Sequence, residues 1–247
     1  MLARLGIVRG DGPGTAPPAA ALNPALDQTL IGVAQDGHTD KVGKGDADKI
    51  ESLLVQGADP NAKDQRGTTA LVWALTFGKD DAAQNLIRHG ADGSLEDANG
   101  ENAAWAAATI YYCPGALDLM IKKGVTVTGL NKQGEMILVA MMKVRAAQPG
   151  QMNYLNDRIW TPAEYQAYEE RERRTFELLI AAGADFNGKD GSETPLMSAV
   201  QSGHVEAVRV LLEHGANTSF RDARGNTALS LAKFDHPEIA SLIGGPR

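Results

Sequence analysis

The sequence of 247 residues predicts an all-α solenoid of about six helix-turn-helix repeats, and two observations lead to that prediction. Polar turns that end in glycine recur at a fixed interval: Gly67, Gly100 and Gly134 are 33 and 34 residues apart, and Ser192 precedes Gly225 by 33. Within the intervals, apolar residues recur at helical spacing in two short stripes. One such helix pair has an apolar face with no cover, so neighbouring pairs must stack.

The last full repeat shows the pattern most clearly. Thr194-Pro195 is suited to begin a helix, because a hydroxyl side chain can cap free amide groups and proline fits the first turn. Gly203 ends this helix. A second apolar stripe runs over 205–212, and Gly215 supplies the positive φ that stops it.

The period, the TPL opening and the LLxxGA close resemble the ankyrin repeat. The resemblance extends from about residue 30 to 243 and implies a concave groove, lined by loop tips and inner helices, where partners bind. The stretches that carry it are LLVQGADPNAKDQRGTTAL (53–71), LIRHGADGSLEDANG (86–100), LLIAAGADFNGKD (178–190), TPLMSAVQSGHVEAVRVLLEHGAN (194–217) and DARGNTALSLA (222–232).

This division predicts a flexible Gly/Pro/Ala-rich arm over 1–23, a repeat domain over 24–243 and a tail over 244–247. The last repeat is short and its exposed face polar, as expected of a cap. The approximate repeats are 24–66, 67–99, 100–133, 134–191, 192–224 and 225–243.

Two insertions interrupt the pattern, at 35–48 in the first repeat and at 143–173 in the fourth. The first is polar and glycine-rich, which predicts an extended turn before a helix from Lys49. Both insertions fall between an inner and an outer helix, so we expect them to project from the same edge, opposite the polar tips. Insertions gathered on one side often mark a working surface.

The larger insertion contains an irregular loop followed by a helix with a capping box at Thr161 and Glu164. This helix is expected to extend at least two turns beyond its neighbours. Glu172 interrupts its apolar stripe and is expected to be solvated. The other stripe residues are Tyr165, Tyr168, Phe176 and Leu179.

Composition narrows the function classes. The net charge of −7 disfavours nucleic-acid binding, which needs a basic surface. No apolar run is long enough for a membrane span, and Arg4 and Arg9 interrupt the N-terminal apolar patch, which predicts a cytoplasmic protein without membrane insertion. A lone cysteine, Cys113, is expected to be a partly buried apolar residue.

No catalytic motif is present: the sequence lacks GxSxG, GxxxxGK[ST] and HExxH, and its five histidines are scattered. We therefore expect a non-enzyme with no cofactor and no metal. The alternative is an enzyme whose site lies in the 143–173 insertion.

The residues most suited to contact a partner lie on loop tips, on one inner helix and in the larger insertion. Trp73 is expected to form an apolar step beside the small residues Ala106 and Ala140, with Phe77 extending it; the alternative is that Trp73 packs into the neighbouring repeat. The remaining candidates are Arg66, Asn99, Lys132 and Arg224 at the tips and Tyr154, Leu155, Trp160 and Tyr165 in the insertion.

The tip residues have an alternative role in ordinary turn chemistry, and the insertion residues could fold back onto the lengthened helix. The function predicted is a protein–protein interaction module, either an adaptor or a subunit of a larger assembly. Two other classes stay open: an inhibitor or immunity protein that blocks an enzyme or toxin, and a secreted effector.

Overall fold

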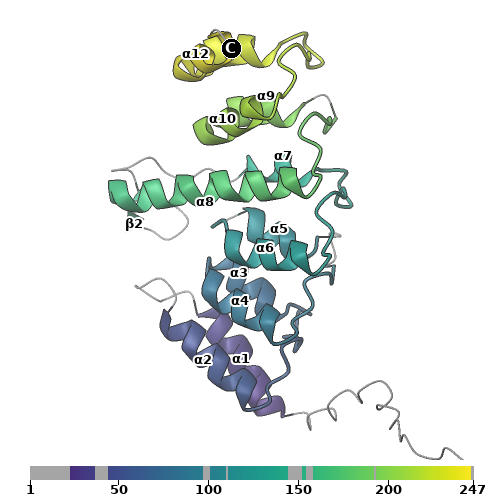
Figure 1. Cartoon of the computed structure of the whole chain (residues 1–247), viewed down its shortest axis with the longest axis vertical. Helices are drawn as coiled ribbons and strands as arrows, with labels where there is room; N and C mark the ends of the chain where they lie inside the picture. The colour runs from purple at the N-terminus through teal and green to yellow at the C-terminus, as the bar shows by residue number, and fades with distance from the viewer. Residues whose placement is uncertain are drawn as a thin grey trace, which may run out of the picture.

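Six helix pairs stack into one elongated array (Figure 1). The structure is a computed structural model that describes residues 23–36, 44–96, 101–109, 111–143, 152–153, 158–191 and 193–245. The odd-numbered helices from α1 to α11 form an inner row, in which each helix contacts the next. The even-numbered helices from α2 to α12 form an outer row, in which each helix also contacts the next. The predicted all-α solenoid is therefore confirmed.

The helices are short except in the fourth pair. In chain order they are α1 Pro24–Gln35, α2 Lys44–Val55, α3 Ala70–Thr76, α4 Asp80–Arg88, α5 Ala103–Thr109, α6 Pro114–Lys122, α7 Ile137–Met141, α8 Pro162–Ala181, α9 Pro195–Ser202, α10 Val205–Glu213, α11 Ala228–Asp235 and α12 Pro237–Gly244. The predicted arm, apart from Asn23, and residues 246–247 lie outside the described part of the chain.

Local sequence signals set where the helices begin and end. The Thr194 hydroxyl accepts a hydrogen bond from the Met197 amide at the start of α9, and Gly203 ends that helix with φ of 74°. Gly90 and Gly215 follow α4 and α10 with φ of 97° and 83°, as predicted. The repeated glycines therefore act as helix stops.

The first insertion differs from its prediction, because α2 begins at Lys44 and not at Lys49. Polar composition indicated a loop here, yet Asp46 is buried and its carboxylate lies 2.9 Å from the Lys79 ammonium of the next repeat. Lys79 also donates to the carbonyl oxygen of Val33 at 2.8 Å. The partner across the repeat boundary neutralises the charge, so the polar segment can be part of a buried helix.

The second insertion contains more regular structure than expected. Two short strands, β1 Met152–Asn153 and β2 Arg158–Ile159, pair antiparallel in place of the predicted irregular loop. The capping box at Thr161 is confirmed, and α8 has 20 residues against 9 in α6 and α10. Its N-terminal end and β2 project from the edge opposite the inter-repeat loops (Figure 1).

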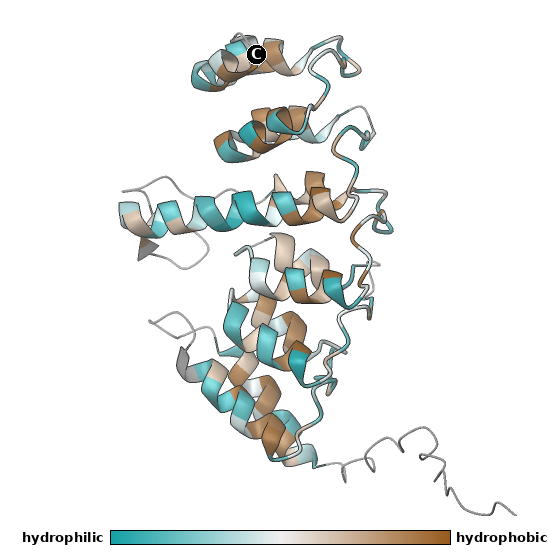
Figure 2. Ribbon diagram, viewed as in Figure 1, coloured by the Kyte–Doolittle hydropathy of each residue, from teal (hydrophilic) through white to brown (hydrophobic). Residues whose placement is uncertain are grey.

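Glu172 is buried, so the prediction of a solvated position in α8 is wrong. Its Oε1 lies 2.6 Å from His204 Nδ1 and accepts a hydrogen bond from the Tyr112 hydroxyl at 3.2 Å. Burial raises the pKa of Tyr112, and the Glu172 carboxylate raises it further, so the phenol keeps its proton and donates. Although α8 is hydrophilic along its middle (Figure 2), this residue points inward and joins three consecutive repeats.

The buried acids occupy one recurring position, eleven residues before the glycine that closes each outer helix. The first and fourth repeats, which carry the insertions, have an acid at this position. The second repeat has a lysine there, and the fifth repeat has a histidine. In chain order the residues are Asp46, Lys79, Cys113, Glu172 and His204, all of them buried.

Candidate protein-interaction surface

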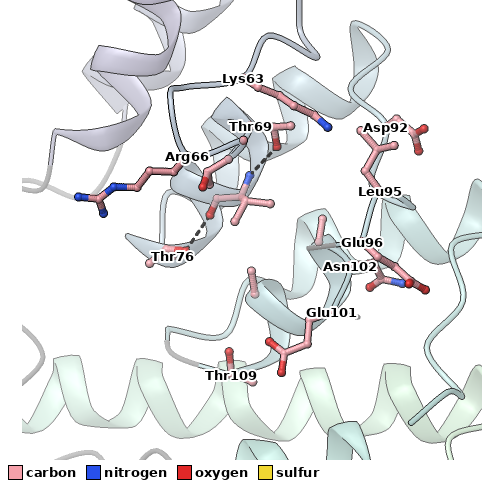
Figure 3. Close-up of a pocket in the computed structure, with 15 residues that line it drawn as sticks. Lys63, Arg66, Thr69, Thr76, Asp92, Leu95, Glu96, Glu101, Asn102 and Thr109 are labelled. Carbon is pink, nitrogen blue, oxygen red and sulfur yellow. Dashed lines mark hydrogen bonds between the residues drawn. The ribbon is translucent and has the colours of Figure 1, made fainter. Parts of the chain in front are cut away.

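A pocket of about 420 Å³ lies between the second and third repeats, over α3 and α5 (Figure 3). Val72 and Thr76 of α3 and Ala106 and Thr109 of α5 line it, and these side chains are only half-buried. The surface of the pocket over α5 is recessed, because the small residue Ala106 occupies the position in α5 that Trp73 holds in α3. The array thus leaves a hollow where two inner helices meet.

Two loops form the walls of the pocket and carry opposite charges. The segment before α3 contributes Lys63 and Arg66, and the segment before α5 contributes Asp92, Glu96 and Glu101. Figure 3 shows the Lys63 side chain extending toward the wall with Asp92, whereas the Arg66 side chain extends away from it. Leu95, which is 38% exposed, adds an apolar surface between the charged groups.

The loop tips are fixed by hydrogen bonds to their own backbone. Asp64 Oδ1 accepts from the amides of Arg66 and Thr68 at 2.8 and 2.9 Å. Partial burial acts to raise the pKa of Asp64, but hydrogen bonds, chiefly from Thr68 and Trp73, outweigh it and lower the pKa. Asn131 and Asp222 make the same pair of backbone contacts in their own repeats. Asp64, Asn131 and Asp222 therefore follow ordinary turn chemistry, and contact of the tips with a partner stays a prediction.

Trp73 and Phe77 lie beside the pocket and face the first repeat. Their rings stack with centroids 5.9 Å apart and planes 13° apart. Trp73 is half-buried, and its indole Nε1 donates to Asp64 Oδ2 at 3.0 Å. Gln35 of α1 donates to the same oxygen at 3.2 Å. Trp73 thus packs toward the neighbouring repeat, while Phe77 stays 37% exposed; their role as a partner contact stays a prediction.

The insertion residues predicted to contact a partner differ in how far they are buried. Trp160 is 6% exposed and contacts Tyr168, with ring centroids 5.0 Å apart, and Tyr165 is half-buried against the core. This matches the alternative in which the insertion folds back onto α8, and it excludes Trp160 as an exposed anchor in the free chain. Ile159, which is 59% exposed, is the apolar side chain presented at this edge. Tyr154 and Leu155 lie outside the described residues.

The predicted tip residues are not brought together in one site. Arg66, Lys132 and Arg224 are exposed in three different repeats, and of these only Arg66 lines the pocket. Asn99 lies outside the described part. Sequence reasoning missed Lys63, Leu95 and Glu96, although their position next to the turns could have indicated them.

The described residues offer little for other chemistry. Among them, no group of three or more His, Cys, Asp or Glu side chains could hold a metal ion. Cys113 is buried, and that burial raises the pKa of its thiol, so it stays protonated. Within the same described ranges, the helices are too short or too polar for any of them to span a membrane.

The chain is a helical repeat solenoid. Its helix pairs stack, glycines end its helices, and Asp or Asn side chains hold its loop tips. A family model described as ankyrin repeats (3 copies) matches residues 40–130 and 164–244, and the chain belongs to the ankyrin-repeat family. The unmatched segment between these ranges, residues 131–163, contains the first two thirds of the larger insertion, residues 143–163. This family is in general one of protein–protein interaction modules.

Relatives carry the same repeats within longer proteins. The chain is 28% identical over 192 residues to the E3 ubiquitin-protein ligase KEG of Arabidopsis thaliana, covering 76% of this chain and 11% of the relative. It is 29% identical over 200 residues to the putative palmitoyltransferase ZDHHC13 of Danio rerio, covering 78% and 26%. The chain therefore spans about a quarter or less of these two relatives' lengths.

Solved structures share the fold. An ankyrin repeat domain from Acinetobacter baumannii AYE aligns with a TM-score of 0.59 at 24% identity, covering 87% of this chain and 95% of that one. A second ankyrin repeat protein aligns with a TM-score of 0.59 at 19% identity, covering 90% and 98%. These likenesses concern the fold alone.

Proposed function

We propose that this chain is a non-catalytic adaptor or subunit that binds another protein in the pocket over α3 and α5. The observation that carries the proposal is the hollow between two loop segments, with an apolar floor and charged groups on both sides. Pockets that combine an apolar floor with a few placed polar groups suit a specific partner segment. Trp73 and Phe77 extend this surface toward the first repeat, and aromatic residues are enriched among binding hot spots.

The charge of the chain supports a protein partner over a nucleic acid. With a net charge of −7, the surface repels a phosphate backbone at long range. A protein partner could instead be an enzyme or toxin whose face is blocked, or a host protein met by a secreted effector. The cytoplasmic location stays a prediction.

The edge formed by the second insertion is a second candidate surface. It is favoured by the length of α8 beyond its neighbours and by the exposed side chain of Ile159 on β2. Both surfaces can act together, because the groove and the edge lie on one rigid array.

The test is co-purification of the chain at native abundance, identification of the attached protein, and measurement of its affinity for variants. Ala106→Trp fills the pocket floor at a position where the preceding repeat already accepts Trp73. We expect it to abolish binding, while Glu238→Lys on the exposed face of the last repeat leaves binding unchanged. Unchanged affinity of Ala106→Trp would show that the partner lies elsewhere.

A further inference from the structure

The pocket over α3 and α5 has one cation and one anion that nothing in the described chain neutralises. The Lys63 ammonium and the Glu96 carboxylate are exposed, and neither has a hydrogen-bond or ion-pair partner among the described residues. An unpaired cation and anion in one pocket are available to a ligand.

A second anion is fixed at the end of the pocket nearer the fourth repeat. Glu101 is half-buried, and its Oε1 accepts a hydrogen bond from Asn131 Nδ2 at 3.0 Å. Asn131 is itself buried and holds the next loop tip through backbone contacts. Glu101 is therefore held in position, and it adds negative charge where Glu96 already lies. Figure 3 shows Glu96 and Glu101 on the α5 side, away from the loop that carries Lys63.

The surface between these charges is apolar and shallow. Val72, Leu95 and Ala106 supply carbon atoms, and the half-buried hydroxyls of Thr76 and Thr109 lie at the border. Such a floor accepts an apolar side chain of a partner. Lys63 thus lies on one side of the apolar floor and Glu96 and Glu101 on the other, while Asp92 carries a further negative charge on the wall toward which Lys63 extends.

We infer that the pocket takes an extended segment of a partner protein that carries an acidic residue, an apolar residue and a basic residue in spatial order. The acid lies toward Lys63, the apolar side chain on the floor, and the base toward Glu96 and Glu101. A partner of a single charge sign, including a nucleic acid, meets repulsion at one end. This inference rests on the proposed function and specifies the partner chemistry for the same site.

The test uses the full chain and a displayed library of random 12-residue peptides, selected on the wild type at low salt. Enriched peptides are expected to carry an acid and a base on either side of an apolar residue. The charge-swap variant Lys63→Glu/Glu96→Lys keeps the net charge and should bind these peptides on the order of tenfold more weakly. Peptides with the acid and base exchanged should prefer the swap variant.

The matched control is Lys233→Glu/Glu238→Lys, which swaps two exposed charges of the last repeat, far from the pocket and from the insertion, and should leave affinity unchanged. Equal binding of the peptides to wild type and to Lys63→Glu/Glu96→Lys overturns the inference, and so does an enriched set with one charge sign. If Ala106→Trp still abolishes peptide binding in that case, the proposed function stands and only the partner chemistry is wrong. If Ala106→Trp has no effect, the groove itself is not the site.

A second copy of this chain is the remaining possible occupant of the pocket. If the charge swap changes the concentration-dependent elution of the chain alone, the occupant is a second copy, and the inference of a partner segment is wrong. Circular dichroism and melting curves of each variant establish that a loss of binding does not come from unfolding.

Discussion

Glu172 Oε1 lies 2.6 Å from His204 Nδ1, and both side chains are at least nine-tenths buried. Because Tyr112 donates to the same carboxylate oxygen, one acid links the third, fourth and fifth repeats. In a solenoid only neighbouring repeats are in contact, so stability depends on each interface. The Glu172–His204 contact therefore supports the interface between α8 and the fifth repeat.

A double-mutant cycle at this contact should show strong coupling. Removing one member of a buried hydrogen-bonded pair leaves the polar group of the other without a partner, which typically costs about 1–3 kcal/mol, and more for a charged group. We expect Glu172→Leu and His204→Leu each to destabilise the chain, and the double variant to lose clearly less than the sum. Urea unfolding measures the free energies, and Glu170→Leu on the exposed face of the same helix is the control. Additive losses would mean that the contact contributes no coupling.

Valine at a glycine stop should destabilise the array through the backbone alone. A β-carbon at Gly215 would meet nothing within 4 Å, but its φ of 83° is unfavourable for other residues. Gly215→Val should therefore lower the free energy of unfolding by about 1–2 kcal/mol or more, and Gly90→Val should do the same. Superimposable denaturation curves of wild type and Gly215→Val would refute the role assigned to this glycine.

Gly115 is required for a different reason, which is space. Asp80 of α4 accepts hydrogen bonds from the amides of Gly115 and Ala116 at 3.0 and 2.7 Å and so caps α6. A β-carbon at Gly115 would lie 2.7 Å from Asp80 Oδ2 and 2.3 Å from Gln84 Nε2. Gly115→Ala should displace the cap and lower the melting temperature, since a lost cap costs about 1 kcal/mol.

The control for Gly115→Ala is Gly32→Ala in α1, where a β-carbon meets nothing within 4 Å. There the helix gains about 0.5–1 kcal/mol from the replacement of glycine by alanine. The two substitutions are chemically identical, so we expect melting temperatures to move in opposite directions. If both melting temperatures rise, the side chains of Gln84 and Asp80 must move away from the new β-carbon at residue 115 without a loss of stability.

Replacing residues 145–171 by a short glycine-containing turn should leave the array folded but less stable. The repeat pattern closes without the insertion, yet Tyr168 is buried against Tyr112, with ring centroids 5.0 Å apart. Removing a large buried aromatic typically costs about 3–5 kcal/mol. Circular dichroism and urea unfolding check both statements, and complete loss of helical signal would place the insertion in the essential core.

The same shortened chain tests the insertion edge as a binding surface. If this edge carries the partner, binding is abolished while the helical array persists. Unchanged affinity for the co-purified partner would assign binding to the groove over α3 and α5 and would exclude the insertion edge.

The sequence by itself determined the repeat architecture, because its signals are local. Thr194 and Gly203 act within one turn of their own helix, and the capping box at Thr161 needs only Glu164 three residues later. The period then requires that equivalent helices stack, since no single pair can cover its apolar face. The glycine stops, the stacking of about six repeats and the extra length of α8 were accordingly predictable, whereas the start of α2 at Lys44 was not.

Only the tertiary structure decided which polar residues are buried and where a pocket opens. Asp46 and Glu172 resemble solvated charges in sequence, because the side chains that pair with them lie more than 30 residues away in the next repeat. The pocket likewise depends on how Lys63, Leu95 and Glu96 come together across a repeat boundary. A periodic pattern specifies each repeat, whereas burial and site geometry arise from contacts between repeats, which the pattern does not encode.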